Sequence, residues 1–251
     1  MEIWDCFCGI GRWRSRDMLL PHDPAEFLSL MDHFGIRKAL VYGNMGAEGG
    51  SVRQANAFVC EAASQSDRFL PAFILAPLDP YEPFDLDDLA SEMRSAGAKA
   101  AWMWPQGGRR GHGLHRWLVG DLLHMCAAHR LPLLLFIEGI DPDSIDRMCG
   151  DFPKLRVILT GLSYAADQWV YPLLRRHPRL FLCLGHYYIP ARGARAFVER
   201  FGDERLVFGS GLPHFSPGGL IAHLNYADLA PNSLENILHA NLHRLLSEVS
   251  L

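Results

Sequence analysis

The sequence predicts a (β/α)₈ barrel formed by a single domain across residues 1–251. Short apolar runs rich in β-branched residues alternate along the chain with longer amphipathic stretches, which is the pattern of repeated βα units around a parallel sheet. The chain has 251 residues and is 49% hydrophobic, so it has a usual length for such a barrel and can fill a large core. No linker or low-complexity segment divides it.

Eight short runs are the expected strands, and amphipathic stretches between them are the expected helices. The strands are predicted at residues 2–6, 38–42, 70–76, 98–104, 131–137, 155–160, 179–184 and 205–208. The clearest helical stretches are 23–34, 53–66, 86–96, 115–129 and 192–201. Pro24 and Pro142 each follow an aspartate, which is typical of the first turn of a helix.

A doubly wound open sheet is the competing architecture. It would usually carry a glycine-rich phosphate-binding turn after its first strand. The segment Gly9-Ile10-Gly11-Arg12-Trp13-Arg14 lacks the third glycine of that motif. The closed barrel is therefore favoured.

Charge and composition predict a cytoplasmic protein that binds neither nucleic acid nor a membrane. A formal net charge of -4 is no electrostatic footprint for nucleic acid or an anionic membrane. The longest apolar run, residues 131–137, is too short to span a bilayer, and no segment resembles a signal peptide. The six cysteines are scattered without a CxxC pair, which is typical of reduced thiols in a cytoplasmic protein.

Four segments of the sequence occur in the same order in one known family. They are Asp5-Cys6-Phe7-Cys8-Gly9-Ile10-Gly11, Phe152-Pro153-Lys154-Leu155, Asp203-Glu204-Arg205-Leu206-Val207-Phe208-Gly209-Ser210, and Ile237-Leu238-His239-Ala240-Asn241-Leu242-His243-Arg244-Leu245-Leu246. In these segments the chain resembles the amidohydrolase superfamily, in its amidohydrolase-2 branch of decarboxylases, lactonases and hydrolases, which have the TIM-barrel fold. The resemblance implies an active site at the carboxyl ends of the strands, with a divalent metal held by four histidines and an aspartate.

All five of those metal-site positions differ in this chain. The resemblance places the family's histidines at Phe7, Gly9, Phe136 and Gly161, and its aspartate at Gly211. Phenylalanine and glycine offer no side-chain lone pair to a cation. The family's mechanism needs a metal to activate water and a carboxylate to move its proton. Without them, no group at these positions can generate hydroxide or transfer the proton. We therefore expect no metal and no other cofactor.

Other residues could rebuild a catalytic site, and the weak candidates are His186, His214, Glu138 and Asp5. Two histidines and a glutamate are a known zinc set, but pocket-rim or loop positions are the favoured explanation for these three. Asp5 is expected to face the barrel interior. Burial should raise its pKa, and a neighbouring strand should supply a hydrogen-bond donor. Strand alternation places Cys6 and Cys8 on the opposite face, against the helices, as core thiols.

The expected function is non-catalytic binding or regulation through a small-molecule pocket, floored by Phe7 and Phe136. The pocket is predicted to include Phe7, Gly9, Arg12, Trp102, Trp104, Phe136, Gly161, Tyr164, Tyr187 and Gly211. The cluster Arg12, Arg14 and Arg16 makes a carboxylate one candidate ligand. The alternatives are a metal-independent hydrolase (lactonase-like) or decarboxylase, and a structural subunit that pairs with an active relative. A homodimer is a compatible assembly.

Overall fold

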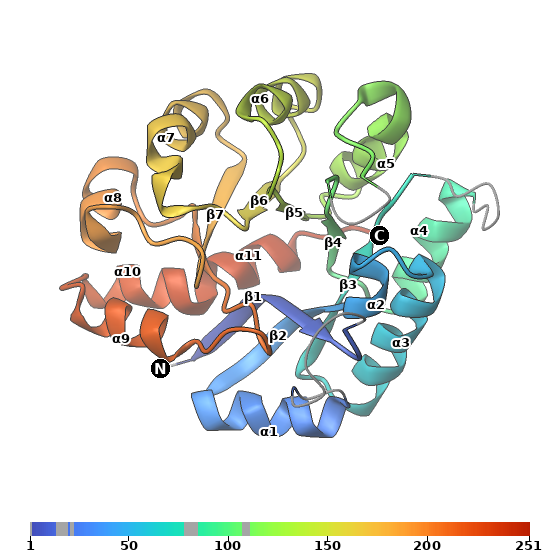
Figure 1. The fold of residues 1–251 in the computed structure, drawn as a ribbon, viewed down its shortest axis with the longest axis horizontal. Coiled ribbons are helices and arrows are strands. Elements are labelled where there is room, and N and C mark those ends of the chain that lie inside the picture. The colour runs from blue at the N-terminus through green and yellow to red at the C-terminus, as the bar shows by residue number, and fades with distance from the viewer. Residues whose placement is uncertain (1, 14–19, 21–22, 78–84, 107–110) are drawn as a thin grey trace.

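A computed structural model describes residues 2–13, 20, 23–77, 85–106 and 111–251. Its centre is a sheet of eight parallel strands in the sequential order β1 to β8, surrounded by helices (Figure 1). The (β/α)₈ prediction is confirmed. The strands are β1 (Ile3–Ile10), β2 (Ile36–Gly43), β3 (Phe69–Ile74), β4 (Ala100–Met103), β5 (Leu133–Phe136), β6 (Val157–Thr160), β7 (Leu180–Leu184) and β8 (Leu206–Phe208).

The helices alternate with the strands, and aspartate–proline pairs begin two of them as expected. Asp23 accepts a hydrogen bond from the backbone N–H of Glu26 and caps α1, and Asp141 caps α6 by accepting one from Ser144. The longer helices are α1 (Pro24–Phe34), α3 (Val52–Gln65), α4 (Leu86–Ser95), α5 (Arg116–Ala128), α6 (Pro142–Asp151), α7 (Asp167–Arg176), α8 (Gly193–Phe201) and α9 (Gly218–Tyr226). Shorter ones are α2 (Asn44–Ala47), α10 (Pro231–Glu235) and α11 (Asn241–Ser247). No helix in the described part of the chain is long and apolar enough to cross a membrane.

The barrel interior is a separate apolar core that α11 helps to fill. Leu242, Leu245 and Leu246 of α11 belong to the same buried cluster as Leu40 and Ile158 of the strands. Asn241, at the start of α11, donates hydrogen bonds to the carbonyls of Asp203 and Leu206 around β8. These hydrogen bonds fix the C-terminal segment to the barrel. None of these α11 residues lines the pocket described below.

A bulge in β1 corrects two of the sequence-based expectations. Asp5 pairs with Ala39 and Cys8 with Val41, so three steps along β1 match two along β2. The extra residue puts both Cys6 and Phe7 in the interior core, whereas regular alternation would separate them. Cys6 therefore does not face the helices, and its Sγ lies 3.6 Å from Sγ of Cys183.

The bulge also turns Asp5 away from the barrel interior. Its register partner Ala39 belongs to the core between the sheet and the helices, and so does Cys8. The expectation that Asp5 faces inward with Phe7 was wrong, because the bulge breaks the alternation on which it rested. Asp5 is nevertheless fully buried.

Asp5 helps to close the barrel between β1 and the segment after β8. Its Oδ1 accepts hydrogen bonds from the backbone N–H groups of Phe7 at 3.0 Å and of Ser210 at 2.9 Å. The expected donor from the neighbouring strand region is therefore present. The backbone N–H of Gly9 donates to the carbonyl of Leu212, and that of Gly211 donates to the carbonyl of Phe7, both at 2.9 Å. Together with the bonds to Asp5 they form the seam that joins β1 to the segment after β8. Burial raises the pKa of the Asp5 carboxyl to about 6, against the opposing effect of these hydrogen bonds.

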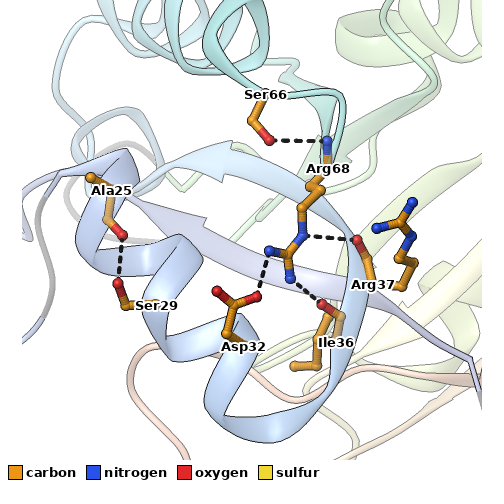
Figure 2. Close-up of polar contacts among 7 residues, drawn as sticks. All are labelled: Ala25, Ser29, Asp32, Ile36, Arg37, Ser66 and Arg68. Carbon is orange, nitrogen blue, oxygen red and sulfur yellow. Dashed lines mark hydrogen bonds and ion pairs between the residues drawn. The ribbon is translucent and has the colours of Figure 1, made fainter.

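Arg68 connects the amino end of β2 to α1 (Figure 2). Its guanidinium donates to the backbone carbonyls of Ile36 at 2.7 Å and Arg37 at 3.2 Å. It also forms an ion pair with Asp32 of α1 at 2.6 Å. One planar cation thus satisfies two backbone acceptors and orients the preceding helix.

Replacing Arg68 with methionine is expected to lower the free energy of unfolding by about 1–3 kcal/mol, because both carbonyls lose their donor. Urea denaturation at neutral pH measures the change. Arg53→Met is the matched control, since the one polar contact of Arg53 with other described residues is an exposed ion pair with Glu92 at 3.6 Å. An equal loss in the two variants would show that the carbonyl bonds contribute nothing.

Candidate aromatic pocket

A small cavity of about 80 Å³ lies at the carboxyl ends of the strands, the end at which the sequence predicts the site. Eight of its eleven lining residues are aromatic. They come from β1, β2, β4 and β5, and from the segments that follow β1, β4, β7 and β8. The lining consists of Phe7, Trp13, Tyr42, Trp102, Trp104, Phe136, Glu138, Tyr187, Gly211, His214 and Phe215.

The floor of the pocket is a row of stacked rings. The Phe7 ring lies 5.7 Å from Phe136, with 20° between the ring planes, and 5.7 Å from Tyr42. Tyr42 in turn stacks on Trp102 at 4.5 Å and 19°. Burial raises the pKa of the Tyr42 phenol well above its usual value, so Tyr42 is a neutral ring of this row. Each ring restricts its neighbour, which keeps the floor in one shape.

The wall and rim continue from Phe136 through edge-to-face contacts. Trp104 meets the Phe136 ring at 5.0 Å, and Tyr187 meets it at 5.9 Å. Tyr187 also contacts Phe215 at 4.9 Å. Such contacts contribute beyond the area that they bury, and they leave parts of the rings facing the cavity.

Neighbouring side chains fill much of the space beside the three glycines at predicted metal-site positions. A Cβ on Gly161 would lie 2.7 Å from the Phe136 ring, and one on Gly211 would lie 2.9 Å from Phe215. A Cβ on Gly9 would lie 2.0 Å from Oδ1 of Asn44. Gly161 and Gly211 also have φ of +72° and +77°, a conformation that favours glycine. Glycine there serves the backbone and lets other side chains enter.

The structure places six of the ten predicted pocket residues in the lining. Those six are Phe7, Trp102, Trp104, Phe136, Tyr187 and Gly211. Gly9 and Gly161 lie behind the side chains that cover them. Arg12 is exposed and outside the lining, and Tyr164 is 79% exposed in a short 3₁₀ turn. Arg14 and Arg16 lie outside the described residues.

The sequence reasoning missed Trp13, Tyr42 and Phe215. Tyr42 carried a usable signal, since it lies near the carboxyl end of a predicted strand and alternates with the inward-facing Leu40. Trp13 and Phe215 come from irregular segments, whose direction no periodicity specifies.

Two of the four catalytic candidates reach the pocket. Glu138 and His214 belong to the lining, and the His214 ring lies 4.5 Å from Trp13. His186 is exposed outside the lining, where it stacks on Phe215 at 3.9 Å and 9°. Asp5 is buried in the seam described above. The structure therefore does not bring the four together.

Two buried donors in the lining have no hydrogen-bond partner among the described residues. They are the indole Nε1 atoms of Trp102 and Trp104. Trp102 is only 2% exposed. A buried tryptophan usually finds an acceptor for its N–H group, since leaving that group unpaired forfeits a hydrogen bond to water. The pocket thus has an apolar surface with two donors of unmet capacity.

The residues of this site do not fit a divalent metal. Phe7 and Phe136 place stacked hydrocarbon rings at two of the positions that the resemblance matches to ligands, and Asn44, Phe136 and Phe215 cover the glycines. Within the described ranges, no three His, Cys, Asp or Glu side chains are grouped so that they could hold an ion. Glu138 and His214 are two potential ligands, one fewer than the protein usually supplies even at a catalytic zinc site.

Comparison with known proteins agrees with this architecture. The sequence profile of the family described as Amidohydrolase matches residues 11–247. No curated protein sequence matches the chain. An uncharacterized TIM-barrel protein from Bordetella bronchiseptica superimposes with a TM-score of 0.74 at 20% identity, covering 99% of both chains.

Two further structures of named activity are similar in fold. The 2,6-dihydroxybenzoate decarboxylase from Rhizobium has a TM-score of 0.70 at 15% identity, and the match covers 98% of each chain. A probable 2-pyrone-4,6-dicarboxylic acid hydrolase from Acinetobacter baumannii, with citric acid bound, has a TM-score of 0.69 at 12% identity. That match covers 98% of this chain and 100% of the hydrolase.

Proposed function

This chain belongs to the amidohydrolase family, and from that premise we propose that it binds a small ring-shaped molecule without the family's metal centre and without catalysing its conversion. The observation that carries the proposal is the stack of Phe7 and Phe136, whose rings lie 5.7 Å apart at two positions matched to metal-binding histidines. Packed rings at these positions supply an apolar binding surface and cannot hold a metal that would act as a Lewis acid.

The shape and chemistry of the pocket favour a single flat ring. An enclosed apolar cavity of about 150 Å³ can hold benzene, so a space of about 80 Å³ admits one ring that stays partly in the opening. Aromatic walls bind flat rings through stacked and edge-to-face contacts. The similar structures named for dihydroxybenzoate and pyrone chemistry act on rings of this size, which supports the same choice here.

The described lining favours an uncharged ligand over the carboxylate that the sequence suggested. It contains the carboxylate of Glu138 but neither lysine nor arginine, and Arg12 is not part of it. An anion would lose hydration on entering and would meet a like charge. We place this function in the cytoplasm, which the six free cysteines favour.

Tyr187→Ala is expected to weaken the binding of a neutral ring probe such as acetophenone by about 2- to 10-fold, the worth of one aromatic contact. Tyr187 lines the pocket and is 38% exposed, so its removal should leave the fold intact. Tyr164→Ala is the matched control, because Tyr164 lies outside the lining. Titration calorimetry or tryptophan fluorescence measures both affinities. Equal weakening, or no binding to the wild type, would refute the proposal.

Metal-independent hydrolysis or decarboxylation is the second candidate, and the shared position of Glu138 and His214 in the lining favours it. A carboxylate and an imidazole can act as base and acid on one bound substrate. The test is turnover of a panel of neutral lactones and aryl esters by chelator-treated protein. Activity that Glu138→Gln and His214→Gln both abolish would establish this candidate in place of simple binding. A purely structural subunit is disfavoured by the open pocket.

A further inference from the structure

We infer that the ligand carries neutral hydrogen-bond acceptors, such as carbonyl oxygens, which Trp102 and Trp104 recognise through their indole N–H groups. This inference rests on the proposed binding function and specifies the ligand more narrowly. It starts from two observations that coincide: both tryptophans line the pocket, and both Nε1 atoms are buried without a hydrogen-bond partner among the described residues.

Strand geometry explains why the two donors occur together. Trp102 lies in β4 and Trp104 just after it, two residues apart, so their side chains leave the same face of the strand. Neighbouring rings hold both indoles. Trp102 stacks on Tyr42 at 4.5 Å, and Trp104 meets Phe136 edge-on at 5.0 Å. The direction of each N–H is therefore set before any ligand arrives, which lowers the entropy lost on binding.

The indole N–H determines which ligand atom can serve. It donates and cannot accept, so its partner must be an acceptor. A hydrocarbon ring would leave both buried donors unpaired. A ring with a carbonyl or ether oxygen at its edge would satisfy one or both donors.

Charge then selects among the acceptors. A carboxylate is a strong acceptor, but the described lining offers the carboxylate of Glu138 and neither lysine nor arginine to compensate its charge. A quaternary ammonium ligand would suit aromatic faces and Glu138, but it has no acceptor for the two indoles. A neutral oxygen acceptor on a flat ring meets all three features of the site.

Four probes of similar size separate these chemistries on the intact protein. Acetophenone carries a carbonyl, and α-methylstyrene has nearly the same shape but no acceptor. Benzoate is an anion, and phenyltrimethylammonium is a cation. Acetophenone is expected to bind at least about fivefold more tightly than α-methylstyrene, the effect of one net hydrogen bond. It should also bind more tightly than either ion.

Protein labelled with ¹⁵N-tryptophan reports on the donors directly. The chain has six tryptophans, so the indole N–H region of the spectrum can be assigned with single Trp→Phe variants. Acetophenone should shift the Trp102 or Trp104 indole signal downfield, and α-methylstyrene should not. The signal of Trp117, which is 81% exposed on α5, should not respond to either probe.

The variants Trp102→Phe and Trp104→Phe keep a ring and remove one donor each. In at least one of them, acetophenone and α-methylstyrene should bind with about equal affinity. If a variant does not fold, the affinity ratio and spectrum of the wild type still decide. Equal binding of the two neutral probes, or tighter binding of either ion, would overturn the inference and leave ring binding intact. Failure of all four probes would overturn the proposed function as well.

Discussion

Phe136→Ala is expected to lower the free energy of unfolding by about 3–5 kcal/mol, the usual result of removing a buried aromatic side chain. Phe136 is almost fully buried, and its ring contacts Phe7, Trp104 and Tyr187. It also occupies the space beside Gly161. One substitution therefore removes contacts of the floor and the wall of the pocket together. Denaturant unfolding followed by far-ultraviolet circular dichroism measures the change.

The same variant should lose affinity for neutral ring probes, because the Phe7 ring loses its stacked partner in the pocket floor. Tyr226→Ala is the control for stability, since Tyr226 is 90% exposed and its removal should change the unfolding free energy by no more than about 0.5 kcal/mol. A loss below about 1 kcal/mol in Phe136→Ala would contradict the view that this ring fills the space beside Gly161 and supports the pocket.

Asp5→Asn is expected to change the pH dependence of stability by about 2 kcal/mol between pH 4 and pH 8. Burial raises the pKa of Asp5 to about 6 in the folded protein, whereas an unfolded chain has an aspartate pKa near 3.9. Between these values the folded state holds a proton that the unfolded state releases, so stability falls as pH rises. The contribution is full below about pH 3.9 and is lost as pH rises through about 6.

Asparagine cannot titrate, yet its side-chain oxygen can accept the same two backbone hydrogen bonds. The unfolding free energy of the variant should therefore gain on that of the wild type as pH rises. Asp141→Asn is a control of opposite sign. Hydrogen bonds from the Ser144 hydroxyl and backbone N–H lower the pKa of Asp141, so its contribution is lost as pH falls. Parallel pH curves for wild type and Asp5→Asn would show that Asp5 does not carry this effect.

The fold was predictable from the sequence because short buried strands leave a clear apolar signal. All eight expected strands are present, and their exact ends differ most in β1, which runs from Ile3 to Ile10. The bulge in β1 left no such signal. An inserted residue shifts the facing of Asp5 and Cys6 without changing the composition of the strand.

The pocket was predictable where strands deliver side chains and unpredictable where loops do. Phe7, Trp102 and Phe136 follow from strand position, whereas Phe215 depends on a segment without periodicity. The glycines show a second limit. Sequence alone cannot say whether Gly211 leaves a void or admits Phe215, because that depends on the path of a residue four positions away.

The central claim is that the aromatic pocket binds its ligand without a metal. The most direct test measures the metal content of the purified protein and its affinity for acetophenone, before and after exhaustive chelation and with zinc or manganese added. The account predicts that the protein retains far less than one equivalent of bound metal after dialysis at every stage. It also predicts the same affinity for acetophenone throughout. A stoichiometric metal that survives dialysis, and whose removal abolishes binding, would contradict it.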